Sequence, residues 1–182
     1  VNDGDNILVP NPGFPLYQVI AESLGAQVKH YPLLSNKRWE CDLNEMDKLI
    51  DNNTKAILIN NPSNPCGANY SAKHLTDIAA IARKHNLPII ADEIYAGIVF
   101  DGVFTAANSV SGDVPVFSMG GLAKEFCVPG WRVGWIVIHD RDGRLANLKN
   151  GIKQLTQLIV GANSVVQACI PSVLTPEKGS ND

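Results

Sequence analysis

The chain has 182 residues, of which 45% are hydrophobic and 18% are charged. This length suits one large domain, since domains typically run to roughly 100–200 residues, and the composition excludes wholesale disorder. Lysine and arginine number 15 against 18 aspartates and glutamates, which gives a net charge of −3 without any basic block. The chain therefore lacks the electrostatic character of a protein that binds nucleic acid or an anionic membrane.

The four cysteines are far apart in the sequence and form no CxxC pair: Cys41, Cys66, Cys127 and Cys169. Their spacing argues against a zinc site, and their low density argues against a disulfide scaffold, so we expect no metal and a reducing compartment. The uncharged stretch 154–176 carries several polar residues and is better interpreted as buried helix than as a membrane span. The first five residues contain no initiator Met and no signal-peptide pattern, so we expect a fragment of a longer protein.

Short apolar runs alternate with segments of helical periodicity from the N-terminus onward. Residues 6–9 are typical of a buried strand, and residues 10–13 of a turn. A helix is predicted over 15–24, and residues 26–31 return as a strand. In that helix we expect an inward face made by Val19, Ile20 and Leu24.

Two helix starts are marked by capping residues. Asp42 and Glu45 have the spacing of a capping box in front of an apolar face, and Ser71 can cap the following helix. The inward positions of these two helices are Leu43, Met46, Leu49 and Ile50 in the first, and Leu75, Ile78 and Ala82 in the second. A strand is predicted between them over 55–60.

The remaining pattern continues the alternation of strands and helices. Strands are predicted over 88–92, 115–118 and 132–138, and helices over 145–160 and 163–173. Such alternation implies crossover connections, and hence an α/β fold with a mostly parallel sheet and helices on both faces. We expect one domain over 1–174 and a polar tail over 175–182. Ligands of such sheets bind beyond the carboxyl ends of the strands.

Lys124 and Asp92 are the first candidates for chemistry at that edge. Lys124 follows a predicted strand in the small-residue segment 118–124, where a desolvated amine favours Schiff-base formation. The alternative is a solvated loop lysine. Asp92 closes an apolar run and can face a ligand from the strand end, although it can equally be a turn or helix cap.

Four further residues have both a functional and an ordinary interpretation. Asn64 lies in the proline-stiffened segment 61–67, which is otherwise a plain turn former. Tyr95 offers a phenol near Asp92 or is an amphipathic core residue. Arg132 can bind phosphate or form a surface ion pair, and Phe14 can stack on a planar ligand or lie in the core.

Together these residues meet the needs of an electron-sink cofactor. Such a cofactor requires an aldehyde-capturing lysine, an acid at its ring nitrogen, donors to a ring oxygen, an anchor for phosphate and a stacking partner. One chain supplies all of them, which predicts a site for pyridoxal 5'-phosphate.

The chain resembles the fold-type I, class I aminotransferases over nearly its whole length. The resemblance rests on PNPGFPLY at 10–17, NNPSNPCG at 60–67, ADEIYAGIVF at 91–100 and GGLAKEFCVPGWRVGW at 120–135. The PGW insertion before Arg132, together with GGLAK, indicates the tyrosine branch of the family rather than the aspartate branch.

The resemblance implies a role for each candidate. Lys124 would form the internal aldimine and shuttle a proton to and from the substrate. Asp92 would pair with the pyridinium nitrogen, and Asn64 and Tyr95 would hydrogen-bond the ring oxygen. The phosphate would be held by Arg132 and the ring covered by Phe14. The implied reaction moves an amino group from an aromatic amino acid, tyrosine, to a 2-oxo acid in a homodimeric enzyme.

Three departures from the family pattern stand out. Gly121 replaces a serine that helps to bind the phosphate in many members, a role left open to Ser118 or to backbone amides. Cys127 replaces an aliphatic or very small residue, and we expect it to be a buried packing variant. The family's N-terminal portion and small domain, including the arginine that grips the substrate carboxylate, have no counterpart here, so we expect little turnover from this chain alone.

The sequence is also compatible with other functions. Alanine or kynurenine transamination, or a lyase reaction, would use the same cofactor residues on the same fold. A non-catalytic α/β binding module is a second alternative, which the intact Lys124, Asp92 and Arg132 argue against. A dinucleotide-binding domain is disfavoured because no G-x-G-x-x-G follows a strand. We expect a cytoplasmic location, with the mitochondrion as the alternative.

Overall fold

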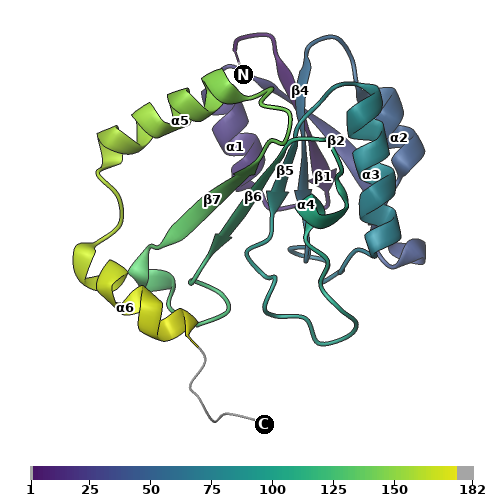
Figure 1. Cartoon of the computed structure of the whole chain (residues 1–182). Helices are drawn as coiled ribbons and strands as arrows, with labels where there is room; N and C mark the ends of the chain where they lie inside the picture. Colours follow the sequence, from purple (N-terminus) through teal and green to yellow (C-terminus); the bar gives the residue numbers. More distant parts are fainter. Residues whose placement is uncertain (1, 176–182) are drawn as a thin grey trace.

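A computed structural model describes residues 2–175 and shows one seven-stranded sheet in the order β3-β2-β1-β4-β5-β6-β7 (Figure 1). The five central strands are parallel, and the two edge strands β3 and β7 are antiparallel to their neighbours. The strands are β1 (Asn6–Asn11), β2 (Gln27–Leu34), β3 (Glu40–Cys41), β4 (Thr54–Asn60), β5 (Ile89–Asp92), β6 (Val116–Gly121) and β7 (Gly134–His139). The predicted mostly parallel α/β sheet is confirmed.

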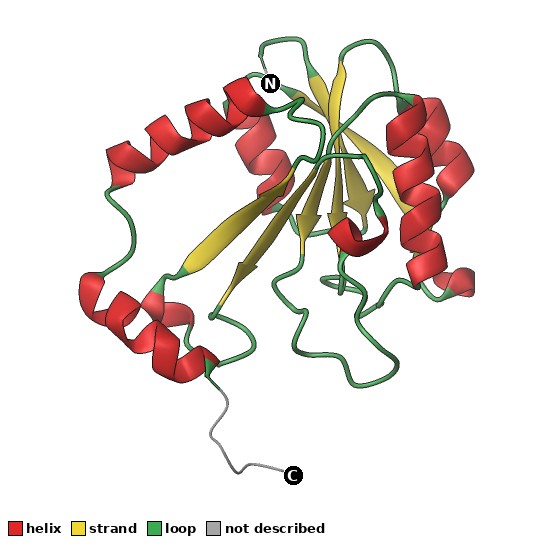
Figure 2. Ribbon diagram, viewed as in Figure 1, coloured by secondary structure: helices red, strands yellow, loops and turns green. Residues whose placement is uncertain are grey.

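Helices cover both faces of this sheet (Figure 2). One face carries α2 (Leu43–Leu49), α3 (Ala72–Lys84) and the short α4 (Ala107–Val110), and the other carries α1 (Leu16–Ser23). Successive strand side chains supply the two layers alternately: Leu8 and Ile57 belong to the α3 side, whereas Val9 and Leu58 belong to the α1 side. A central strand buried on both faces explains the continuous apolar runs of the sequence.

The predicted helix caps are present. Asp42 accepts hydrogen bonds from the backbone amides of Asn44 at 3.0 Å and Glu45 at 3.1 Å, and Ser71 accepts one from the His74 amide at 3.1 Å. Only half of the predicted capping box forms. The Asp42 amide donates to the Pro32 carbonyl at 2.9 Å, while the Glu45 side chain accepts from Lys48.

The predicted inward face of α1 is wrong. Val19, Ile20 and Leu24 are 58%, 50% and 61% exposed, and the helix meets the sheet through Tyr17 and Ala21 instead. These two residues are one turn apart and so lie on the same side of the helix. The segment before α1 also differs from the prediction, because residues 10 and 11 extend β1 rather than form the turn.

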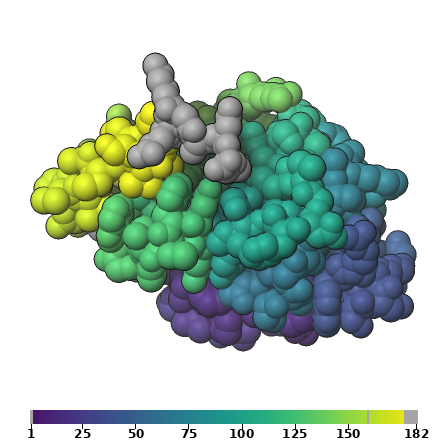
Figure 3. All heavy atoms as spheres, turned by 90° about the horizontal axis from the view of Figure 1, so that it is seen from below, coloured from purple at the N-terminus to yellow at the C-terminus, as the bar shows by residue number. Residues whose placement is uncertain are grey.

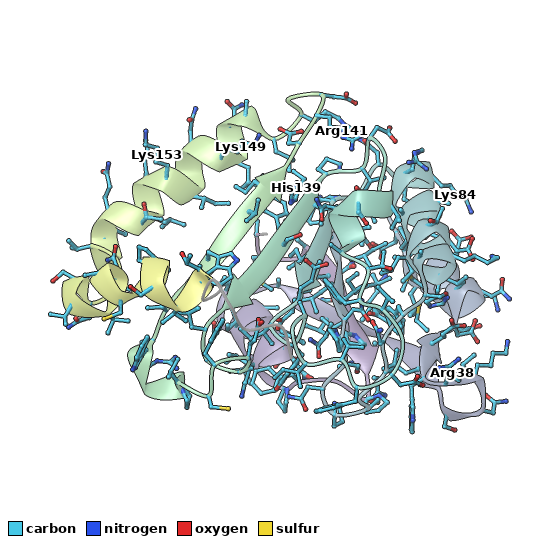
Figure 4. All side chains as sticks on the ribbon, turned by 60° about the horizontal axis from the view of Figure 1, so that its bottom comes forward. Arg38, Lys84, His139, Arg141, Lys149 and Lys153 are labelled. Carbon is cyan, nitrogen blue, oxygen red and sulfur yellow. The ribbon has the colours of Figure 1, made fainter. Side chains whose placement is uncertain are left out.

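The two C-terminal helices are α5 (Ala146–Ile159) and α6 (Ser164–Leu174), as predicted, but the expected burial is wrong. Leu155, Leu158 and Val165 are more than half exposed, and α6 has no buried residue. Both helices flank the β7 edge (Figure 1), and α6 lies at the margin of the molecule (Figure 3). They therefore cover little of the sheet, and Figure 4 shows the exposed Lys153 on α5.

Two expectations concern the C-terminal part of the chain. Apart from Thr175, the tail predicted over 175–182 lies outside the described residues. Within residues 2–175, none of the helices is long and apolar enough to cross a membrane.

Candidate active site

A pocket of about 270 Å³ lies where β4, β5 and β6 end. This is the edge at which ligands of open α/β sheets bind, and the volume is close to the lower limit of small-molecule sites, about 300 Å³. Five of the six predicted site residues line it: Phe14, Asn64, Asp92, Tyr95 and Lys124. The fold thus brings together residues that are up to 110 positions apart in the sequence, from Phe14 to Lys124.

Asp92 is the acceptor at the floor of the pocket. Its Oδ2 accepts a hydrogen bond from the Tyr17 hydroxyl at 2.6 Å, and its Oδ1 accepts one from the Ile94 amide at 3.2 Å. Burial, reinforced by the Asp92 carboxylate, raises the pKa of the Tyr17 phenol well above its ordinary value, so this phenol is a donor. A ligand that meets the carboxylate must therefore bring a further donor, such as a protonated ring nitrogen.

Asn60 builds the neighbouring wall from the end of β4. Its Nδ2 donates to the Asp92 carbonyl at 3.1 Å, and its Oδ1 accepts from the Asn64 amide at 2.6 Å. Tyr17 and Asn60 were both missed by the sequence analysis. Each lies inside a segment that carried the family resemblance, three or four positions from a predicted residue, and this proximity was the available signal.

Lys124 follows β6 and lines the pocket. Its Nζ lies 5.7 Å from the centroid of the Tyr95 ring, within the range of a cation–π interaction. The backbone leading to it passes Gly120, where a Cβ would lie 2.7 Å from the Trp135 Nε1. A larger residue here would have to displace the Trp135 ring, which packs over Gly120 from the neighbouring strand β7.

Arg132 is the one predicted site residue that does not line the pocket. It follows the 3₁₀ turn Pro129–Trp131, is exposed, and donates from Nη1 to the Pro129 carbonyl at 3.0 Å. Its assignment to phosphate stays a prediction. Ser118 does not line the pocket either: it is buried, whereas its neighbour Met119 faces the pocket, as strand alternation requires.

The prediction that Cys127 is a buried packing residue is wrong. Cys127 is exposed and has a positive φ of 54°. It lies in the turn after Lys124, where its amide donates to the Lys124 carbonyl at 3.1 Å. The tight backbone of the turn places this side chain outside the core. All four cysteines are free thiols, and the described residues contain no cluster of metal-ligating side chains.

The chemistry of the pocket fits a flat heterocycle that carries a carbonyl group. Asp92 can accept from a protonated ring nitrogen, Phe14 offers an aromatic surface, and the Lys124 amine can attack a carbonyl carbon. Asn64 and Tyr95 add polar groups to the lining, and the Tyr95 ring lies beside the lysine.

Comparison with known proteins agrees with this geometry. Residues 1–181 match the family described as "Aminotransferase class I and II". The chain belongs to the class I and II aminotransferases. Two aminotransferase relatives are the tyrosine aminotransferases of Dictyostelium discoideum, 51% identical over 97% of this chain, and of Homo sapiens, 48% identical over 98%.

A solved aminotransferase structure shares the fold. The crystal structure of tyrosine aminotransferase from Leishmania infantum superposes with a TM-score of 0.89 and 44% identity over 93% of this chain. The chain spans 43% and 40% of the lengths of the two relatives, and 46% of the crystallised chain. This aminotransferase chain therefore corresponds to less than half of each of those proteins.

Proposed function

We propose that the protein acts in pyridoxal 5'-phosphate-dependent transamination, moving the amino group of an aromatic amino acid, tyrosine first, to a 2-oxo acid. The observation that carries this proposal is the pocket itself, which joins the amine of Lys124 and the carboxylate of Asp92 at the ligand-binding edge of the sheet. The preference for tyrosine is supported by relatives named tyrosine aminotransferase at 48–51% identity. A homodimer and a cytoplasmic location are part of the proposal.

Each pocket residue has a task in this reaction. When bound, the coenzyme supplies an electron sink that makes the α-hydrogen of an amino acid acidic. Lys124 would hold the coenzyme through Nζ, and the same amine would move the proton at the substrate α-carbon. Asp92 keeps the ring nitrogen protonated, and Phe14 excludes water from one face of the ring.

The polar groups around the lysine complete the binding site. Asn64 and Tyr95 would donate to the ring oxygen, and Arg132, which lies outside the lining of the pocket, would bind the phosphate. Tyr95 also places its ring next to the Lys124 amine, at 5.7 Å from Nζ to the ring centroid, which limits the positions open to that amine.

The proposal is tested by an absorbance titration of the purified protein with pyridoxal 5'-phosphate, followed by borohydride reduction and peptide mapping. We expect a visible band, and after reduction the coenzyme attached to the peptide that contains Lys124. Lys124→Ala should lose both signals, whereas Lys153→Ala, a matched change on the outer side of α5, should keep them. Labelling of other lysines alone, equal in the two variants, would contradict the proposal. Bleaching of the band by tyrosine faster than by alanine, in the full-length protein, tests the substrate preference.

A further inference from the structure

The hydrogen bond between Tyr17 and Asp92 joins two layers of the fold. Tyr17 lies in the first turn of α1, and Asp92 is the last residue of β5, 75 positions later in the chain. The hydroxyl oxygen and Oδ2 are 2.6 Å apart, which is within the range of a charge-assisted hydrogen bond from O–H to a carboxylate. Tyr17 is also one of the two residues through which α1 meets the sheet, so its position is set by the packing of the helix.

The direction of this bond is fixed. The Tyr17 side chain is half-buried, and burial together with the Asp92 charge raises the pKa of its phenol well above the ordinary value, so it carries its proton at any working pH. The neighbouring Phe14 ring meets the Tyr17 ring edge-on, with centroids 5.6 Å apart and an interplanar angle of 77°. This contact restricts rotation of the phenol away from the carboxylate.

Asp92 is consequently held at both oxygens. Tyr17 donates to Oδ2, and the Ile94 amide donates to Oδ1 at 3.2 Å. Rotation of the carboxylate about its Cβ–Cγ bond would break both bonds. The amide bond alone is longer and comes from a residue only two positions away, so it restrains this rotation less.

We infer that Tyr17 is a positioning residue, which orients the Asp92 carboxylate toward the ring nitrogen of the coenzyme through the hydrogen bond to Oδ2. This inference rests on the proposed function. Tyr17 acts through Asp92, so its contribution should depend on the presence of a nitrogen at that ring position. A ligand of the same shape without the nitrogen gains nothing from an oriented carboxylate.

The test compares two ligands on the variant Tyr17→Phe, which removes only the hydroxyl. The ligands are pyridoxal 5'-phosphate and its 1-deaza analogue, in which a C–H group replaces the ring nitrogen. We expect Tyr17→Phe to weaken binding of the first by about tenfold, the loss of one hydrogen bond to a charged group, and to leave the Kd of the analogue unchanged. The matched control is Tyr31→Phe, since the Tyr31 hydroxyl donates at 2.8 Å to the Leu58 carbonyl in the core.

A second measurement needs no coenzyme. In protein labelled with ¹³C at the tyrosine ζ position, the Tyr17 resonance should move on Asp92→Asn, while the Tyr31 resonance should stay in place. An unmoved Tyr17 resonance would overturn the inference, because the contact would then be absent from the free protein.

The outcomes separate this inference from the function on which it rests. If the unaltered protein takes up no coenzyme at Lys124, the proposed function fails and the positioning role fails with it. If the unaltered protein takes up coenzyme normally, but Tyr17→Phe weakens the binding of both ligands equally or of neither, the proposed function stands and the inference is wrong. Equal losses in Tyr31→Phe and Tyr17→Phe would likewise indicate a merely structural role.

Discussion

Asn60 holds Asn64 in place through a hydrogen bond of 2.6 Å from the Asn64 amide to the Asn60 Oδ1. The same carboxamide donates from Nδ2 to the Asp92 carbonyl at 3.1 Å, and the residue is only 2% exposed. A single side chain therefore fixes the separation between two predicted coenzyme-binding residues. Its two bonds tie the segment after β4 to the end of β5.

Replacing Asn60 should loosen the pocket and destabilise the fold. Asn60→Ala leaves the Asn64 amide without its partner, whereas the Asp92 carbonyl keeps a hydrogen bond from the Asn61 amide at 3.0 Å. We therefore expect the free energy of unfolding to fall by about 1–3 kcal/mol and coenzyme binding to weaken by about tenfold. Urea unfolding and absorbance titration measure the two effects. Asn52→Ala, in an exposed turn, is the control and should change neither. A stable Asn60→Ala protein with normal binding would show that the carboxamide is dispensable.

Gly121 is a second position where adding a single methyl group should lower the free energy of unfolding. A Cβ there would lie 2.8 Å from the Val133 carbonyl oxygen and 3.2 Å from the Gly134 Cα, both backbone atoms of the neighbouring chain segment. Gly121→Ala must therefore displace the β6–β7 pair, and we expect a loss of about 1–3 kcal/mol in the free energy of unfolding.

Gly130 offers the matched comparison, because its Cβ would meet nothing within 4 Å. Gly130→Ala should change the free energy of unfolding by no more than about 0.5 kcal/mol. If the two variants proved equally stable in urea, the close approach at Gly121 would not constrain the fold. Serine at this position would meet the same obstacle as alanine.

The sequence predicted what depends on neighbours along the chain. The Asp42 and Ser71 caps, and the strands that end at Asn60 and Asp92, follow from local patterns of polarity and are present. The face of α1 was not predictable in this way. Apolar side chains lie on several sides of that helix. Only its packing against the sheet determines that Tyr17 and Ala21, and not Val19, face inward.

In the candidate site, too, local sequence predicted some residues, whereas others depend on contacts between distant segments. Residue types and spacing identified Lys124 and Asp92, and the fold places both in one pocket. The partner of Asp92, in contrast, is 75 residues away, and no periodicity indicates that Tyr17 rather than Tyr95 reaches its carboxylate. The prediction that Cys127 is buried was wrong for a backbone reason: its positive φ directs the side chain outward from the turn.

Phe14 provides a prediction about the open side of the pocket. Its ring is 40% exposed and lines the pocket, where it can cover a flat ligand. Stacking is worth about 0.5–1.5 kcal/mol beyond burial, so Phe14→Leu should weaken coenzyme binding by about two- to tenfold, while Phe14→Trp should preserve it. Phe100→Leu, the same change at a ring outside this pocket, should leave the Kd unaltered. Tight binding by Phe14→Leu would argue against stacking.

His74 lies in α3, and its buried side chain packs against the edge strand β3. The ring must be neutral for its Nε2 to accept a hydrogen bond there. Its Nε2 accepts a hydrogen bond from the Cys41 amide at 3.2 Å and lies 3.0 Å from the Cys41 Sγ. Burial raises the pKa of the Cys41 thiol, so that group is neutral as well. Burial lowers the pKa of His74, an effect that Lys73 reinforces and that Glu40 and Asp77 oppose.

This lowered pKa should make stability depend on pH. Below the ordinary histidine pKa of about 6.5, the unfolded chain binds a proton that folded His74 does not, so the free energy of unfolding falls as the pH falls. The loss for one such group is at most about 1.4 kcal/mol per pH unit and ceases below the folded-state pKa. Urea unfolding between pH 7.5 and 5.5 should therefore show a steeper decline in the unaltered protein than in His74→Gln. Parallel declines would mean that folded His74 binds its proton as readily as the unfolded chain does.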